Sequence, residues 1–367
     1  MLILLLVCAA LSFVLTGLLI RRARRHAMAY AETMPQRFHV GHVPRLGGAA
    51  MFAACSLCWG WLAGAAMYGW PAPVHIDPDL ALRLWLVTLV PAAAGIIEDL
   101  TQRLAARWRL LLTLIAGGIA VFALDLSFGR AGIPVVDNWF LAYPWIGMGL
   151  AILAIGGLPH AYNLIDGYNG LAGTVALICC MALAYVAFKV GDRQLAGIAL
   201  ALAGATAGFL AWNYPRGLIF AGDGGAYLWG AVISTLSLML VARHAQVSPW
   251  FPVLLMLYPI QETLFSIYRK VVRGQSPAMA DALHLHQLIY RRLVRGVFHD
   301  DEARRVLMRN NRTSPYLWGF TLLTVLPAVL FWNQTGLLLL CIVAFIVVYV
   351  WSYSSIVRFK LQRWVRR

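Results

Sequence analysis

The chain has 367 residues, of which 61% are hydrophobic and 12% are charged. A soluble domain usually carries about 25% charged residues, so the composition excludes an ordinary soluble protein and indicates a polytopic membrane protein. The formal net charge of +15 comes without any nucleic-acid-binding motif, so we assign it to topology and to contact with the lipid bilayer, and expect no nucleic-acid partner.

Apolar runs of about membrane-spanning length recur along the whole chain. In chain order they predict eleven spans, at about 2–20, 46–68, 82–97, 109–126, 143–161, 170–188, 194–213, 224–242, 250–268, 314–332 and 336–355. The expected fold is an all-α integral membrane protein, a polytopic bundle of about 11 transmembrane helices. We expect one transmembrane domain over residues 1–367.

The distribution of basic residues predicts the orientation of this bundle. The first span is followed by "RRARR" and has no positive residue before it, which favours a retained helix over a cleaved signal peptide. The segments predicted to be inside are about 21–45, 97–109, 159–170, 212–224 and 268–313, with the C-terminal tail. Together they hold 25 of the 30 Lys and Arg residues. This bias predicts an outside N-terminus and a cytoplasmic C-terminus.

Most of the 15 acidic residues fall in loops as ordinary solvated charge. Six others lie in or beside the apolar runs and polar motifs: Glu98, Asp99, Asp166, Asp223, Glu262 and Asp281. A charge near the centre of a membrane helix costs about 2.5–3.5 kcal/mol, so such residues are functional candidates. For Glu262 we favour a structural role, paired with Arg269 or with another helix, and for Asp281 a helix cap remains an alternative.

Five polar motifs stand out, and all fall on the same predicted side of the membrane. They are "MPQRFHVGHVPRLGGAA" (34–50), "GIIEDLTQRLAARWRL" (95–110), "NLIDGYNG" (163–170), "WNYPRGLIFAGDGGAYLWG" (212–230) and "DALHLHQLIYRR" (281–292). The pair Gly47 and Gly48 in the first motif is equally compatible with simple helix packing. Because the five motifs meet on one side, we expect them to form one site.

These motifs suit a metal and a phosphorylated ligand. Asn163, Asp166 and Asn169 are three residues apart and share one face of a helical turn. "GDGG" combines the Asp223 carboxylate with flexible backbone whose N–H groups can face a phosphate at a helix start. Mg²⁺ is usually held by one or two protein oxygens plus water and substrate phosphates, whereas zinc prefers a tighter His and Cys cluster.

In this order, the five motifs resemble those of the polyprenyl-phosphate N-acetylhexosamine-1-phosphate transferase family, over residues from about 34 to 292. "PQRFHVGHVPRLGG" is similar to its entry loop, "GIIED" to G-x-x-D-D and "NLIDGYNGLAG" to N-x-x-D-G-x-[DN]-G-L-A. "NYPRGLIFAGDGGA" is similar to N-x-P-x-x-x-F-x-G-D-x-G-[SA], and "HLHQ" to H-x-H-H. Short outer loops favour the WecA-type branch, which starts O-antigen and teichoic-acid linkage lipids, over the MraY-type peptidoglycan branch.

The resemblance implies a glycosyltransferase of the bacterial inner membrane with a cytoplasmic active site. It would move a sugar 1-phosphate from a UDP-HexNAc to polyprenyl (undecaprenyl) phosphate, release UMP and require Mg²⁺, with Mn²⁺ as an alternative. By position, Asp223 and Asn163 would hold the metal, Asp166 and Asn169 would lie against the uridine end, and His284 and His286 would contact the diphosphate or sugar. Glu98 and Asp99 would be the catalytic acids near the lipid phosphate, and Arg109, Arg45 and Arg37 would bind substrate.

Two departures from the family pattern leave points open. Glu98 replaces the first aspartate of the acid pair, so either Glu98 or Asp99 is a candidate base, and Gln287 replaces the last histidine. The rival hypothesis is a transporter or flippase for an anionic or lipid-linked substrate. It is disfavoured because the polar motifs cluster on one face. The sugar, the lipid length and the oligomeric state, a homodimer among the options, stay open.

Overall fold

The computed structural model describes residues 1–28, 42–276 and 283–358, and all regular structure within these ranges is helical. The first half contains α1 (Leu2–Ala27), α2 (Gly47–Tyr68), α3 (Pro78–Thr101), α4 (Ala106–Ala123), α5 (Pro134–Ala142), α6 (Pro144–Ile165) and α7 (Leu171–Lys189). The second contains α8 (Arg193–Asn213), α9 (Gly222–Arg243), α10 (Trp250–Leu255), α11 (Leu257–Val272), α12 (Leu285–Leu288), α13 (Glu302–Leu330) and α14 (Thr335–Val357). A π-helical turn (Ile289–Leu293) and a 3₁₀ turn (Val294–Gly296) follow α12.

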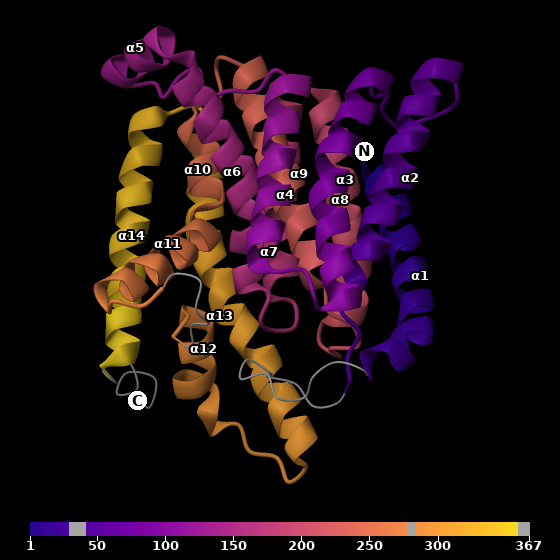
Figure 1. Ribbon diagram of the computed structural model, residues 1–367, viewed down its shortest axis with the longest axis vertical. Helices are drawn as coiled ribbons and strands as arrows, with labels where there is room; N and C mark the ends of the chain where they lie inside the picture. Colours follow the sequence, from indigo (N-terminus) through magenta and orange to yellow (C-terminus); the bar gives the residue numbers. More distant parts are fainter. Residues whose placement is uncertain (29–41, 277–282, 359–367) are drawn as a thin grey trace.

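The all-α polytopic membrane fold predicted from the sequence is confirmed. Within the described ranges, 10 helices are long and apolar enough to cross a membrane. They form a bundle in which α1 begins at the upper end and α14 finishes at the lower end (Figure 1). Ten of the eleven predicted spans correspond to one long helix each, and the ninth does not.

The ninth predicted span, about 250–268, is two helices, α10 and α11, separated at Met256. Pro259 explains the break because its ring has no N–H and would clash with the carbonyl of Leu255, four residues earlier. The thiol of Cys179 donates to this freed carbonyl at 3.6 Å. Figure 1 shows α11 lying across the lower half of the bundle instead of continuing α10.

Helix α11 has its polar side turned toward the protein. Glu262 and Arg269 are buried, whereas Leu264, Tyr268 and Val271 are exposed. This arrangement is the reverse of a helix on the surface of a soluble protein, and it suits a helix whose outer face meets lipid. The broken span therefore places two charged side chains, Glu262 and Arg269, inside the bundle.

Helix α9 is the centre of the bundle, buried along most of its length and in contact with α2, α3, α4, α6, α7, α8 and α10. Glycines allow the close approach. A Cβ on Gly48 would lie 2.0 Å from the Gly225 nitrogen, and a Cβ on Gly95 would lie 2.4 Å from the Asp223 carbonyl carbon. Gly47 and Gly48, the first two residues of α2, thus serve close packing against the start of α9, which is the packing role left open above.

Two elements were not predicted. Helix α13 begins at Glu302, twelve residues before the predicted span, because Asp301 caps it by accepting from the amides of Ala303 and Arg304. Its first part projects below the bundle (Figure 1). Helix α5 is a short helix at the opposite end, without a buried residue.

Candidate active site

The first and fourth motifs are joined by backbone hydrogen bonds. The amides of Gly47 and Gly48 donate to the carbonyls of Phe220 and Ala221, at 2.9 and 2.8 Å, and the amide of Phe220 donates to the Pro44 carbonyl at 2.9 Å. These bonds hold the loop before α2 against the loop before α9. The start of α9 is therefore held by main-chain hydrogen bonds just before Asp223.

Asp223, the second residue of α9, lies where the second, third and fourth motifs meet. Its Oδ2 forms an ion pair with Arg109 of α4 and accepts a hydrogen bond from the Tyr227 hydroxyl at 3.3 Å. Its Oδ1 accepts from the amide Nδ2 of Asn163 on α6, at 2.7 Å. The two residues predicted as metal ligands, Asp223 and Asn163, are thus neighbours.

Asp99, near the end of α3, binds the backbone at the beginning of α9. Its two carboxylate oxygens accept from the amides of Asp223 and Gly224, at 3.0 and 2.9 Å, and its side chain is buried. Gly222 has a φ of +72°, and a Cβ there would lie 2.4 Å from Asp99 Oδ2. The glycine of "GDGG" is therefore required by the close approach of this carboxylate.

Glu98 has a different orientation from its neighbour. Its Oε2 accepts from the amide of Leu104 at 2.7 Å, so it closes the short loop between α3 and α4. The acid pair therefore divides its contacts, with Asp99 anchoring α9 and Glu98 ordering the loop that leads to Arg109.

Asp166 lies just beyond the end of α6, in the bend that precedes α7. No hydrogen bond joins its carboxylate to the described residues. Loss of hydration around the Asp166 carboxyl raises its pKa to about 7. The negative charge of Asp223 adds to this increase, and the positive charge of Arg45 opposes it. Asp166, Asp223 and Arg45 consequently share one electrostatic environment, as expected of groups in one site.

Asn169 is buried in a network that ties this bend to α13. Its backbone amide donates to Asn310 Oδ1 at 2.8 Å and its side-chain Nδ2 to Asn311 Oδ1 at 2.9 Å. The Ser314 hydroxyl donates to the Asn169 carbonyl at 2.6 Å. Asn213, from the fourth motif, accepts from the next amide, that of Gly170, at 2.6 Å. The structure thus directs the Asn169 amide group toward α13.

His284 and His286 stand side by side with their rings stacked, 5.2 Å between centroids. His284 Nδ1 lies 3.2 Å from Glu262 Oε1, which also accepts from the Leu285 amide at 2.9 Å. Tyr349 donates to the other oxygen of Glu262 at 2.7 Å. Glu262 is fully buried and holds the histidine segment in place, so the structural interpretation of this acid fits its contacts.

The histidine segment approaches the bend of the third motif. The His286 ring packs edge-on against Tyr168 with 5.5 Å between centroids, and a Cβ on Gly167 would be 3.4 Å from His286 Nε2. Gln287, where the family pattern has a histidine, uses Oε1 to accept from the His284 amide at 3.4 Å. Four of the five motifs and part of the first therefore meet at one end of the bundle.

Two residues singled out in the sequence, Arg37 and Asp281, lie outside the described residues. Arg45 is described and lies at the start of α2, where its carbonyl oxygen would be 2.1 Å from a Cβ on Gly222. The site therefore contains two described arginines, Arg45 and Arg109, beside three aspartates.

The oxygen donors at Asp223 fit a hard divalent cation. Asn163 donates with Nδ2 only, so its Oδ1 accepts no hydrogen bond from the described residues, and Asp223 Oδ1 accepts one while a carboxylate oxygen can accept two. Across the described ranges, no group of three or more His, Cys, Asp or Glu side chains is arranged to hold a metal. A donor set of one carboxylate and one amide oxygen matches Mg²⁺, which keeps waters and takes phosphate oxygens for the rest.

Several residues of this region were missed by sequence reasoning. Tyr227, Asn310, Asn311 and Ser314 act through contacts with residues far away in the chain. Asn213 could have been found, since it is the asparagine of the "NYP" motif, but its spacing alone gave no role. Asn310 and Asn311 carried no signal because they precede the predicted start of their helix, and Ser314 stands at that start like an ordinary small residue of an apolar span.

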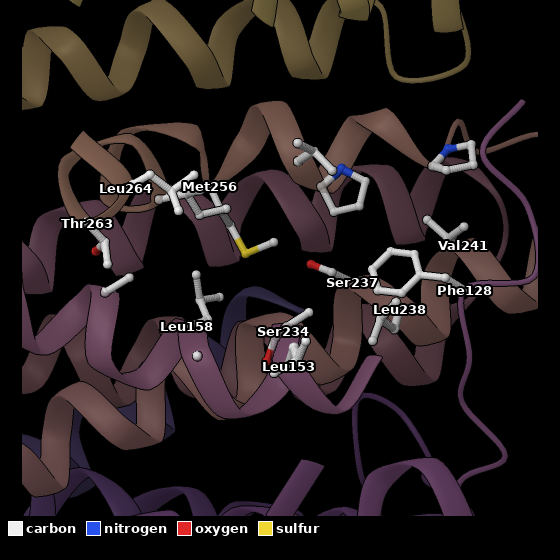
Figure 2. A pocket seen from close by; sticks show the side chains of 17 residues that line it. Phe128, Leu153, Leu158, Ser234, Ser237, Leu238, Val241, Met256, Thr263 and Leu264 are labelled. Atoms are coloured by element: carbon white, nitrogen blue, oxygen red, sulfur yellow. The ribbon is translucent and has the colours of Figure 1, made fainter. Parts of the chain in front are cut away.

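An apolar cavity of about 300 Å³ opens between α6, α9, α10 and α11. Figure 2 shows Leu158, Leu238 and Met256 among the side chains that surround it. It extends from Phe128 at one end to Leu264 of α11 at the other. The break between α10 and α11 therefore borders a hydrophobic channel along the central helix.

Comparison with known proteins agrees with this geometry. Residues 81–241 match the family described as glycosyl transferase family 4. A probable undecaprenyl-phosphate N-acetylglucosaminyl 1-phosphate transferase of Bacillus subtilis is 28% identical, with 68% of this chain and 66% of that protein aligned. A decaprenyl-phosphate N-acetylglucosaminephosphotransferase of Mycolicibacterium smegmatis is 28% identical, over 70% of this chain and 68% of that protein.

A third relative belongs to the peptidoglycan branch. The phospho-N-acetylmuramoyl-pentapeptide-transferase of Moorella thermoacetica is 32% identical over 44% of this chain and 53% of its own length. The chain thus spans about two thirds of the length of the first two relatives and about half of the third. The motifs, their meeting at one end of the bundle and these similarities together support the polyprenyl-phosphate N-acetylhexosamine-1-phosphate transferase family as the one that this chain resembles.

Proposed function

We propose that this protein transfers an N-acetylhexosamine 1-phosphate from a UDP-sugar to a polyprenyl phosphate, such as undecaprenyl phosphate, and releases UMP. The observation that carries the proposal is the meeting of sequence-distant polar segments on Asp223, at the start of the central helix. A transporter is disfavoured because transport sites lie near the middle of the membrane, whereas Asp223, Asn163 and Asp99 all lie within a few residues of a helix end.

In the proposed reaction, an oxygen of the polyprenyl phosphate attacks the phosphorus that carries the sugar. The bond from this phosphorus to the oxygen shared with the uridine-bearing phosphate breaks, and UMP leaves with that oxygen. One phosphoanhydride replaces another, so the chain must chiefly position two anions and neutralise their charge. A phosphate monoester has a second pKa of about 6 and is mostly dianionic at neutral pH, so a strong base is not needed.

The site residues take distinct parts in this proposal. Asp223 and Asn163 would hold Mg²⁺, with Mn²⁺ as an alternative, and the ion when bound would neutralise charge on the diphosphate. Arg109 and Arg45 add positive charge beside it. Asp166, whose carboxylate makes no hydrogen bond to the described residues, would face the uridine end. Because the Asn169 amide is committed to α13, its contribution to nucleotide binding is to hold the bend.

The histidine segment and the acid pair complete the assignment. The stacked His284 and His286 rings would contact the diphosphate or the sugar, and Glu262 keeps them in place. The proposal gives Glu98 a role in ordering the loop that carries Arg109, so of the acid pair Asp99 is the closer to the reacting groups through its contact with the Asp223 amide.

The apolar cavity beside α9 offers a path for the prenyl chain of the acceptor. Its lining is almost entirely hydrocarbon, with Ser234, Ser237 and Thr263 as the few hydroxyls, and its far end reaches Leu264 of α11. Glu262 on the same helix contacts His284. An acceptor lying there would present its phosphate toward the polar end of the helices.

The proposal includes the setting of the enzyme. We place the protein in the bacterial inner membrane as one catalytic domain, with the site facing the cytoplasm, where UDP-sugars are made available. The product would start a lipid-linked cell-envelope polysaccharide such as an O-antigen. A homodimer is compatible with this arrangement.

A donor screen tests the proposal directly. Purified full-length protein in nanodiscs is incubated with undecaprenyl phosphate, Mg²⁺ and, in turn, UDP-GlcNAc, UDP-GalNAc and 6-deoxy UDP-HexNAc donors, and UMP is measured. The expected result is UMP release with at least one donor, dependent on the lipid and abolished in Asp223→Asn. No UMP with any donor would refute the transferase and favour transport.

A further inference from the structure

A second group of polar side chains lies one helical turn deeper in the bundle than Asp223. Its members are Thr113 on α4, His160 on α6 and Tyr227 on α9. Thr113 and Tyr227 follow Arg109 and Asp223 by four residues, and His160 precedes Asn163 by three on a helix that runs the opposite way. Residues three or four apart share a helix face. Each of the three helices therefore contributes one side chain to the first layer (Arg109, Asn163 and Asp223) and one to the second layer (Thr113, His160 and Tyr227).

A hydrogen bond joins His160 to Thr113. The Thr113 hydroxyl lies 2.9 Å from the Leu110 carbonyl oxygen and 3.0 Å from His160 Nε2. This bond holds the imidazole ring against α4.

The ring in turn supports Tyr227. The His160 and Tyr227 rings meet edge to face, with 5.1 Å between centroids and 61° between planes. The Tyr227 hydroxyl then donates to Asp223 Oδ2 at 3.3 Å. A continuous series of contacts thus runs from α4 through α6 to the carboxylate on α9.

Close backbone approach keeps this layer in register. A Cβ on Gly156 of α6 would lie 3.0 Å from the Leu114 Cα on α4, and a Cβ on Gly230 of α9 would lie 2.3 Å from the Pro159 nitrogen on α6. Thr113 and Tyr227 are both buried. None of α4, α6 and α9 can move away from its neighbour without opening these contacts. The side chains of the second layer therefore have little conformational freedom.

We propose that Tyr227 and His160 are positioning residues that hold the Asp223 carboxylate in the orientation that binds the divalent cation. This inference rests on the proposed function. With Oδ2 engaged by Arg109 and Tyr227, Oδ1 is the oxygen that remains available on the side of Asn163. Hydrogen-bonded partners of a metal-binding carboxylate typically contribute 10-fold to 100-fold in metal affinity or activity.

The test measures metal binding separately from turnover. Full-length protein in nanodiscs is titrated with Mn²⁺ in the presence of UDP, and free Mn²⁺ is followed by electron paramagnetic resonance. Tyr227→Phe and His160→Ala should each raise the Mn²⁺ dissociation constant about 10-fold. The Mg²⁺ concentration for half-maximal UMP release should rise by a similar factor, while kcat at saturating Mg²⁺ stays within about 3-fold.

Matched variants separate positioning from general damage. Tyr162→Phe removes a buried tyrosine hydroxyl from the same helix, α6, where the ring packs against Trp229, and should bind Mn²⁺ as the wild type does. His160→Phe keeps a ring against Tyr227 and should recover most of the affinity lost in His160→Ala.

The outcomes are distinguishable. If Asp223→Asn weakens Mn²⁺ binding but Tyr227→Phe and His160→Ala do not, the positioning role is overturned and the proposed metal site stands. If Asp223→Asn also binds Mn²⁺ like the wild type, the proposed metal site fails and this inference fails with it. A fall in kcat at unchanged Mn²⁺ affinity would likewise overturn the positioning role.

Discussion

The carboxylate of Asp99 accepts a hydrogen bond from the backbone amide of Asp223, at 3.0 Å. The acid that the sequence offered as a base thus anchors the helix that carries the candidate metal ligand. Its second oxygen accepts from Gly224, so both oxygens serve the helix N-terminus, where a negative charge is favourable. The geometry favours a role in placing Asp223 over a role in removing a proton.

Replacing Asp99 by asparagine should separate these two roles. The asparagine keeps one acceptor but turns an NH₂ group toward a backbone amide, which costs about 1–3 kcal/mol in a buried place. We expect a lower melting temperature and a loss of kcat/KM of similar size from pH 6 to pH 9. A pH–rate profile checks this, and a loss that disappears at high pH would instead support Asp99 as the base.

Asp223→Asn should abolish transfer. The substitution removes the charge of the proposed metal ligand and the ion pair with Arg109, so we expect kcat/KM for UMP release to fall about 100-fold or more. Raising Mg²⁺ within the physiological range should not restore it. Asp79→Asn is the control, because Asp79 is exposed and forms an ion pair with Arg83, four residues away. Activity near that of the wild type in Asp223→Asn would contradict the assignment.

Asp166 should make the stability of the unliganded protein depend on pH. Its folded pKa of about 7 is above the ordinary value of about 4, so the folded state binds the proton more tightly. The resulting stabilisation is fully present below about pH 4 and is lost as the pH rises to about 7. Asp166→Asn should flatten this part of the curve, as measured by thermal unfolding between pH 5 and pH 8. Parallel curves for the two proteins would show that Asp166 titrates elsewhere.

Glu262→Ala should destabilise the histidine segment. The change leaves the Leu285 amide and the Tyr349 hydroxyl without their buried acceptor, at about 1–3 kcal/mol each, and frees the His284 ring. We expect a lower melting temperature together with weaker binding of the UDP-sugar, measured by calorimetry. Tyr349→Phe removes one of these bonds and should cost only about 1 kcal/mol. Equal effects of the two changes would argue against Glu262 as the common anchor.

The sequence predicted the architecture well because membrane helices leave a strong signal. The length of the apolar runs predicted ten of the spans correctly, since each needs only local composition. The prediction of the ninth span as a single helix was wrong. Pro259 cannot donate to the Leu255 carbonyl and its ring would clash with it, and a hydropathy profile contains no information on this effect.

The site was predicted in part. Polar residues near helix ends, such as Asp223 and Asn163, could be named because polar groups are rare in an apolar chain. Their partners could not, since the contact between Asp99 and the start of α9, or between Asn169 and Asn311, depends on which helices pack together. Tyr227 and His160 resemble ordinary core residues in the sequence, and only the packing of α4, α6 and α9 gives them a role.

The contact between Asp99 and Asp223 also has a consequence for how the protein is made. The two residues are 124 positions apart, and ribosomes add about 5–20 residues per second, so Asp99 emerges about 6–25 s before its partner. During that interval the Asp99 carboxylate on α3 lacks the α9 backbone amides that it binds in the folded protein. Because Asp99 lies near the C-terminal end of α3 and binds the start of α9, the site can close only when α9 has joined the bundle.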